Sequence, residues 1–171
     1  MSTPVWEEIA LSDLSFNPFT LIGSEWMLVC AGDEKEHNAL TASWGGLGVL
    51  WNKNVAFTFI RPQRYTLRFM EDQSHYSLNF FENTYRSALT YFGTHSGRDR
   101  DKDKETGLHA LTDQAAPYYE EARMVMICKK LSMQQMDPAC FIDPTIDEKQ
   151  YPQKDYHQVF VGEIEKILLK K

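Results

Sequence analysis

Four short stretches of this chain carry side chains that could bind or orient a ligand. In the first, residues 38–46, small and polar residues stand beside one tryptophan and end in two glycines. In a strand, Thr41 and Ser43 share one face, and Ala42 and Trp44 share the other. Small residues beside an aromatic wall leave backbone N–H groups open, which suits a flat, isoalloxazine-like ring. The alternative is the end of a core strand with a buried tryptophan.

The second and third stretches could bind anions. Residues 61–66, Arg-Pro-Gln-Arg-Tyr-Thr, join an apolar strand to a predicted helix. N–H groups at a helix start, with a guanidinium and a hydroxyl, suit one phosphate. The alternative is a proline turn between two solvated arginines. Residues 96–98, Ser-Gly-Arg, could form a second anion-binding corner with Lys102, but the interleaved aspartates favour a solvated charged face.

The fourth stretch is Asp155-Tyr156-His157, which leads into the last apolar strand. If it is extended, Asp155 and His157 share a face, so the carboxylate could orient the imidazole or hold it protonated. Gly162 then removes a side chain where a backbone or a ligand approaches closely. The alternative is a surface ion pair followed by a bulge glycine. No stretch has metal-ligand spacing, a phosphate-binding glycine loop or a nucleophile elbow, so we expect no metal.

Composition limits the function classes. The chain has 171 residues, 43% of them hydrophobic and 25% charged, as in one globular domain. Its net charge of −6 argues against a general nucleic-acid binder but leaves room for a local phosphate site. The three scattered cysteines indicate reduced thiols packed as small hydrophobic residues. No apolar run is long enough for a membrane span and no leader segment is evident, so we expect a cytoplasmic protein.

The elements that must position these stretches are mostly strands. Apolar or alternating runs predict strands over residues 26–31, 55–60, 75–81, 124–128 and 158–169. Residues 38–46 follow a charged turn and are expected to pair with residues 26–31 as a hairpin. Glycines 45, 46 and 48 interrupt the strand pattern, and residues 51–54 form a second turn. Short helices are expected over 66–71, from 83 or 84 to 91 with closure by Gly93, and within 96–107 with closure by Gly107. Residues 1–24 are expected to be irregular and 133–153 to form a long loop with one helical turn.

This sequence of elements has no βαβ rhythm, which excludes a doubly wound sheet. The fold class that it favours is mainly β with helical insertions, in the form of a small antiparallel barrel whose closure would hide the strand edges.

In chain order, the four stretches resemble the flavin reductase-like family, and its flavoredoxin branch in particular. The likeness spans about residues 15–168. The matching segments are 38–45 (Asn-Ala-Leu-Thr-Ala-Ser-Trp-Gly), 48–53 (Gly-Val-Leu-Trp-Asn-Lys), 61–66 (Arg-Pro-Gln-Arg-Tyr-Thr), 96–99 (Ser-Gly-Arg-Asp) with Lys102, and 155–157 (Asp-Tyr-His) with 161–164 (Val-Gly-Glu-Ile).

The resemblance implies a single domain over residues 1–171, an FMN-binding split β-barrel, and a homodimer with flavin near the interface. It implies that the isoalloxazine is lined by one segment, namely Thr41, Ala42, Ser43 and Trp44 with Asn38 nearby. It implies that the ribityl phosphate is surrounded by two further segments. One supplies Arg61, Tyr65 and Thr66, and the other supplies Ser96 and Lys102. Asp155 and His157 match an acid–histidine pair near the reactive face. Tyr156 separates that pair, whereas many flavin reductases have the two residues adjacent, and this departure fits the flavoredoxin branch.

The expected function is electron transfer through FMN, as an NAD(P)H:flavin oxidoreductase with NADH or NADPH as donor. In that version, Trp44 and His157 border the pocket where the nicotinamide stacks. The alternative is a flavoredoxin-type electron carrier with a redox protein partner and no nicotinamide turnover. A third hypothesis, a barrel that has lost its flavin and serves as a binding module, is disfavoured by the intact stretches 41–44 and 61–66.

Overall fold

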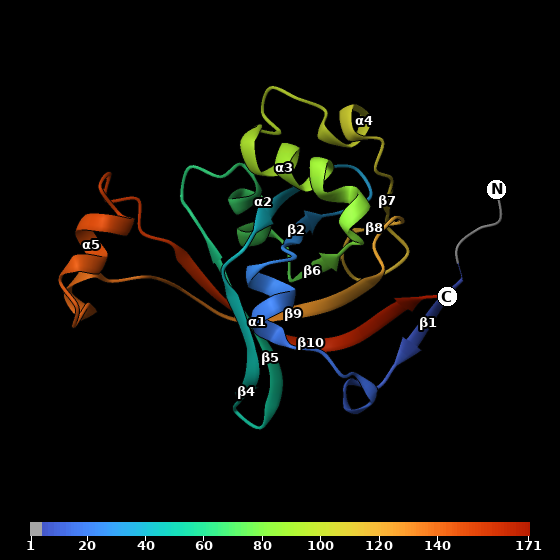
Figure 1. The fold of residues 1–171 in the computed structure, drawn as a ribbon, viewed down its shortest axis with the longest axis horizontal. Coiled ribbons are helices and arrows are strands. Elements are labelled where there is room, and N and C mark those ends of the chain that lie inside the picture. The colour runs from blue at the N-terminus through green and yellow to red at the C-terminus, as the bar shows by residue number, and fades with distance from the viewer. Residues whose placement is uncertain (1–4) are drawn as a thin grey trace.

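The computed structural model describes residues 5–171, and its main feature is one antiparallel sheet of eight strands (Figure 1). Seven strands follow the order β3-β2-β6-β9-β10-β5-β4, and β1 pairs with the end of β10. The bounds are β1 Trp6–Ile9, β2 Met27–Gly32, β3 His37–Ala42, β4 Gly45–Leu50, β5 Lys53–Ile60, β6 His75–Phe80, β9 Met124–Gln135 and β10 Gln158–Lys170. A separate pair joins β7 Ala110–Leu111 to β8 Tyr118–Tyr119.

The two outer strands of that order are consecutive in the chain. β3 ends at Ala42 and β4 begins at Gly45, so only Ser43 and Trp44 connect opposite edges of the sheet. The sheet therefore curls until its edges approach at this link, yet no hydrogen-bonded ladder joins β3 to β4. This is a barrel with a split, and the predicted antiparallel split β-barrel with helical insertions is confirmed.

Helices pack on both faces of the curved sheet and lie in the connections between its strands. α2 (Thr66–Asp72), α3 (Arg86–Thr94) and α4 (Lys102–Thr106) lie together at the top of Figure 1, with α3 packed against β3 and β2. α1 (Pro18–Gly23) lies against β4, and its first turn is capped by the Asn17 side chain. The remaining helical turns are η1 Leu11–Asp13, η2 Asn83–Tyr85, η3 Pro138–Cys140 and α5 Thr145–Gln150.

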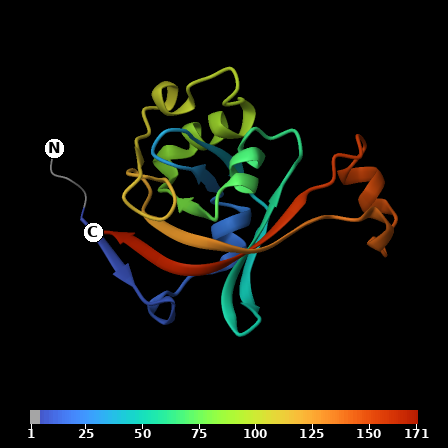
Figure 2. The same cartoon turned by 180° about the vertical axis from the view of Figure 1, so that it is seen from behind.

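Residues 136–157, which connect β9 to β10, form an arm that extends away from the rest of the molecule. α5 lies in this arm, and Figures 1 and 2 both show it well clear of α2, α3 and α4. The arm returns to the sheet at His157, whose carbonyl accepts a hydrogen bond of 2.9 Å from the Met136 N–H. This closure fixes where His157 lies relative to the strands.

Strand β2 is buried on both faces, which explains its unbroken apolar sequence. Met27, Val29 and Ala31 belong to the core inside the curved sheet, whereas Leu28 and Cys30 pack in a second core. That second core lies between the sheet and α3, and it includes the buried side chains Leu89, Phe92, Tyr119 and Val125.

Most predicted elements are confirmed, and four are corrected. Residues 5–24, expected to be irregular, contain β1, η1 and α1, while residues 1–4 lie outside the described range. The glycine-rich residues 45–50 form strand β4 because they pair with β5. α3 continues through Gly93 to Thr94, whereas Gly107 does end α4, at a φ of 73°. β9 extends to Gln135, well past the predicted end.

Gly162 in β10 has a packing explanation. A Cβ at this position would lie 2.4 Å from the Tyr76 hydroxyl oxygen, and the ladder between β10 and β9 shifts register at Val161 and Gly162. The group that approaches this glycine is thus a tyrosine side chain beside a bulge. Of the cysteines, Cys30 and Cys128 are buried as expected, while Cys140 is exposed. No helix within residues 5–171 is long and apolar enough to cross a membrane.

Candidate functional site

The link between β3 and β4 forms one wall of a cavity of about 240 Å³. Trp44 is 47% exposed, which excludes the alternative of a buried core tryptophan. The Thr41 side chain is held by α3, because its hydroxyl donates a hydrogen bond to the Leu89 carbonyl. The lining residues are Leu40, Thr41, Ala42, Ser43, Trp44, Phe59, Ile60, Arg61, Arg64 and His157. The predicted ring-binding segment therefore does face open space.

A second cavity, of about 130 Å³, adjoins the first, and Leu40 and Arg64 line both. It brings together four predicted residues of the anion-binding stretches and Asn38. The amide of Asn38 donates to the Thr66 hydroxyl at 2.7 Å, which joins β3 to the start of α2. Gly97 passes so close that a Cβ there would lie 2.1 Å from the Asn38 side-chain oxygen. The lining is completed by Gln63, Tyr65, Thr94, His95, Ser96 and Lys102.

Two cations meet at this second cavity without a carboxylate partner. Lys102 is only 4% exposed, and its ammonium donates to the Ala39 carbonyl and lies 4.9 Å from the centre of the Phe92 ring. The Arg64 guanidinium donates to the carbonyls of Phe92 and Gly93 at 3.1 and 2.8 Å, at the end of α3. Within residues 5–171, neither cation has a carboxylate oxygen within 4.0 Å.

Burial and mutual repulsion affect the protonation of both groups. Burial first, and then the charge of Arg64, lowers the pKa of Lys102 to about 8. Burial also lowers the pKa of Arg64. A buried cation is costly unless an opposite charge compensates it. The end of the site formed by Lys102 and Arg64 is therefore suited to an anionic group.

Arg61 does not reach this second cavity. Its guanidinium contacts the Asp155 carboxylate at 2.5 Å, donates to the Gln150 carbonyl at 2.8 Å, and lies 5.1 Å from the centre of the Tyr151 ring. Arg61 thus lines the first cavity and ties it to the arm, whereas Tyr65, Thr66, Ser96 and Lys102 line the second.

Asp155 and His157 are neighbours, but the carboxylate does not orient the imidazole. Asp155 binds Arg61 and the Gln63 amide, the latter at 2.7 Å, and these hydrogen bonds lower the pKa of its carboxyl. His157 instead shares a hydrogen bond of 2.8 Å between its Nδ1 and the Tyr151 hydroxyl. Burial and then the charge of Arg61 lower the pKa of His157 to about 4. The alternative in which Asp155 holds a protonated His157 is therefore wrong, because the imidazole is neutral at pH 7.

Comparison with known proteins decides the family. Residues 19–171 match the family described as flavin reductase like domain. The chain belongs to this family. No curated protein sequence matches the chain.

Solved structures of flavin reductase-like proteins share this fold. An FMN-binding domain of a flavin reductases-like enzyme from Shewanella baltica OS155 aligns with a TM-score of 0.70 and 14% identity, over 99% of this chain and 79% of that one. Flavoredoxin of Desulfovibrio vulgaris (Miyazaki F) aligns at 0.65 and 20% identity, over 95% and 76%. Flavoredoxin from Methanosarcina acetivorans aligns at 0.64 and 19%, over 94% and 74%.

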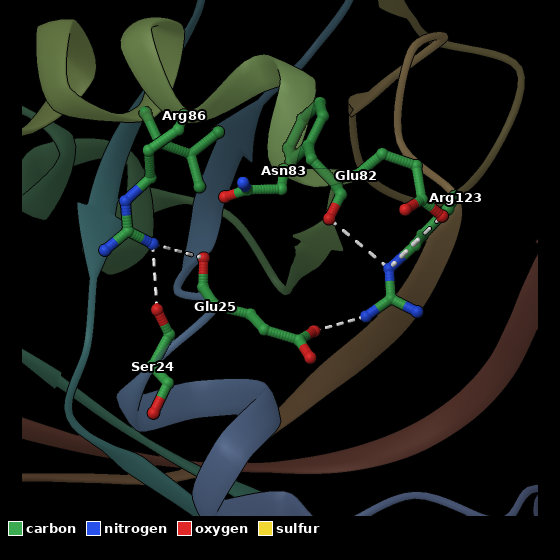
Figure 3. A pocket seen from close by; sticks show the side chains of 8 residues that line it. Ser24, Glu25, Glu82, Asn83, Arg86 and Arg123 are labelled. Atoms are coloured by element: carbon green, nitrogen blue, oxygen red, sulfur yellow. Dashed lines mark hydrogen bonds and ion pairs between the residues drawn. The ribbon is translucent and has the colours of Figure 1, made fainter.

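A larger cavity, of about 290 Å³, lies elsewhere in this flavin reductase-like chain, between the end of α1, η2 and the start of β9 (Figure 3). Its charged groups are matched by the protein itself. Arg86 donates to the carbonyls of Ser24 and Glu25 at 2.8 and 3.1 Å, and Arg123 pairs with the carboxylates of Glu25 and Glu82. Figure 3 shows these groups spanning the hollow, so we interpret it as a structural tie between three segments.

The sequence did not indicate one cation of the joined cavities, one residue of the arm that contacts His157, and one possible ligand cluster. The resemblance implied Arg61 beside the phosphate, whereas Arg64 lines the second cavity, since nothing in the sequence tells which arginine turns inward. Tyr151 lay in the stretch expected to be a loop. His109, Glu120 and Glu121 place potential metal-ligand atoms within 4.8 Å of one another, at β7 and β8. There His109 already pairs with Glu121 at 2.6 Å.

Proposed function

We propose that the joined cavities bind FMN and that the chain, as one domain, is an NAD(P)H:flavin oxidoreductase. The observation that carries the proposal is the contrast between the two ends of the site. One end presents Trp44 and backbone to an open cavity. The other presents the buried Lys102 and the half-buried Arg64, neither of which has a carboxylate partner within residues 5–171. A flavin mononucleotide has a matching flat ring and a phosphate.

The residues present fit this cofactor. A phosphate beside Lys102 and Arg64 supplies the negative charge that their burial requires, with hydroxyl donors from Thr66 and Ser96 on the same cavity wall. Thr41, Ala42, Ser43 and Trp44 hold the ring in the first cavity. When bound, FMN supplies hydride acceptance and single-electron exchange, while the protein supplies orientation and electrostatics.

The nicotinamide donor belongs at the open side of the first cavity. The Trp44 and His157 rings are 5.4 Å apart and tilted by 47°, and Trp44 retains half of its surface. In the proposed activity, Trp44 provides the face against which a nicotinamide packs. Neutral His157 provides a hydrogen bond without a net charge.

The second candidate is a flavoredoxin-type electron carrier with a redox protein partner. Two flavoredoxins have this fold. Tyr156 separates Asp155 from His157, a departure that fits the resemblance to that branch. Such a carrier exchanges electrons with the flavin but does not turn over NAD(P)H.

We also propose a homodimer in the cytoplasm. Its support is the apolar surface at the tip of the β4–β5 hairpin and on the arm, where Val49, Trp51 and Ile142 are 73%, 58% and 97% exposed. The three free thiols fit a reducing compartment.

The test is anaerobic reduction of the FMN-loaded protein, followed by visible absorbance. The oxidoreductase predicts that NADH or NADPH bleaches the flavin band within seconds to minutes, and that added free flavin sustains NAD(P)H oxidation. Bleaching by dithionite but by neither nicotinamide favours the carrier. A protein that remains colourless after incubation with FMN and desalting contradicts both candidates.

A further inference from the structure

His157 lies where the arm meets the first cavity, and it contacts both. It is 6% exposed and lines the cavity together with Trp44 and Phe59. On the arm side, the Tyr151 ring crosses it nearly at a right angle, with ring centres 5.5 Å apart. The two ring nitrogens therefore have different surroundings.

Nδ1 faces the arm. It lies 2.8 Å from the hydroxyl of Tyr151, a residue that is 3% exposed. The same hydroxyl lies 3.3 Å from the Met136 sulfur. A phenol has one proton to donate, and an unprotonated imidazole nitrogen is a far better acceptor than a thioether. On this ground we assign the Tyr151 proton to Nδ1, which leaves Nδ1 as the ring nitrogen without a proton.

The proton of the neutral ring then resides on Nε2. The charged groups that face the ring are Arg61 and Asp155. Because the Asp155 carboxylate is already paired with Arg61, it does not stabilise a positive charge on the imidazole. Among residues 5–171, Nε2 has no hydrogen-bond partner. It is also not one of the fully buried side-chain polar atoms that lack a partner. It is the ring atom left to serve a ligand in the cavity.

We propose that Tyr151 is a positioning residue that fixes His157 as an Nε2–H donor to a carbonyl oxygen of the bound ligand. For the identity of that ligand, a flavin or a nicotinamide carboxamide, the inference rests on the proposed function. The assignment excludes His157 as a base that takes a proton at Nε2. A donor fixed in this way keeps the same role from about pH 5 to pH 9.

The first measurement needs no cofactor. Nitrogen NMR of protein labelled in its histidines distinguishes a bare ring nitrogen from a protonated one, and a His157→Gln variant identifies the signal. Wild type is expected to show bare Nδ1 and protonated Nε2. Tyr151→Phe is expected to show both nitrogens at averaged shifts, because both tautomers are then populated. Tyr156→Phe is the matched control, since that hydroxyl contacts Asp147 at 2.9 Å.

A protonated Nδ1 in wild type, or a tautomer unchanged in Tyr151→Phe, overturns the inference. The second measurement follows the reduction of bound flavin by NAD(P)H. Tyr151→Phe is expected to be slower by about tenfold, while Tyr156→Phe stays within about twofold of wild type. Equal rates in all three proteins also overturn it.

The two measurements distinguish failure of the inference from failure of the proposed function. If wild type has the expected tautomer but binds no flavin, the proposed function fails and the positioning role of Tyr151 stands. If flavin binds and is reduced while the tautomer is the opposite one, the inference alone fails.

Discussion

At the scale of single residues, Lys102 is the most informative side chain in the structure. It lies in a charge run whose sequence pattern favours a solvated face. Its ammonium is instead buried against Phe92 and the β3 backbone, while its neighbour Lys104 is exposed. The charge alternation of residues 98–104 is that of a surface helix, so only the fold reveals which lysine turns inward.

The first prediction concerns the charge of Lys102. Lys102→Met keeps the apolar stem but removes the cation, so FMN affinity should fall by about 10- to 100-fold, as for loss of a charged hydrogen bond. Quenching of flavin fluorescence measures the affinity. Lys104→Met, on the same helix, should bind FMN like wild type, and an equal loss in both variants would remove Lys102 from the site.

The second prediction concerns pH. Burial lowers the pKa of Lys102 from 10.5 to about 8 in the free protein. Above that pH the free protein must take up a proton to offer a cation to the phosphate. FMN affinity should therefore decline as pH rises through about 8 and level off once binding no longer restores the charge. Titrations from pH 6 to pH 10 test this, and a slope that persists in Lys102→Met would contradict it.

At the scale of elements, the strands with β-branched or aromatic residues were predictable, and those defined by pairing alone were not. The run over residues 55–60 has high strand propensity and forms most of β5. β4 has three glycines in six residues and is a strand only because β5 lies beside it. β1 is a polar segment that pairs with the last residues of β10, a contact that no local pattern encodes.

The site shows the same division. The position of residues 38–44 and the anion-binding stretches followed from local residue types. The partner of Arg61 did not, because Asp155 is 94 positions away in the chain. Local sequence patterns favoured an Asp155–His157 pair, and the arm replaces it with Arg61–Asp155 and Tyr151–His157.

The third prediction tests how β10 packs. Gly162→Ala places a methyl group within 2.4 Å of the buried Tyr76 hydroxyl, so the strand or the ring must move. Overpacking of this kind destabilises a protein by about 1–3 kcal/mol. Urea unfolding measures the change. Gly23→Ala, at a position with nothing within 4 Å, is the control and should change stability little.

At the scale of the whole molecule, the arm and the β4–β5 hairpin extend from the rest of the protein in different directions, and both carry exposed apolar residues (Figure 1). The first cavity lies at the base of the hairpin, where it is lined by the end of β3, the link to β4, the end of β5 and His157 at the end of the arm.

The fourth prediction follows from that surface. Light scattering coupled to size exclusion should give twice the mass of one chain. A variant with both Val49→Glu and Ile142→Glu should shift toward the single-chain mass, because it charges the proposed interface. A monomeric wild type at micromolar concentration would contradict the proposed homodimer.

The central claim is that one chain recognises both halves of FMN, the ring beside Trp44 and the phosphate beside Lys102 and Arg64. Parallel equilibrium titrations with FMN and with riboflavin, which lacks the phosphate, test it most directly. FMN is expected to bind at least about 100-fold more tightly than riboflavin, as for two charge-assisted contacts. Equal affinities for the two flavins, or no binding of either, would contradict it.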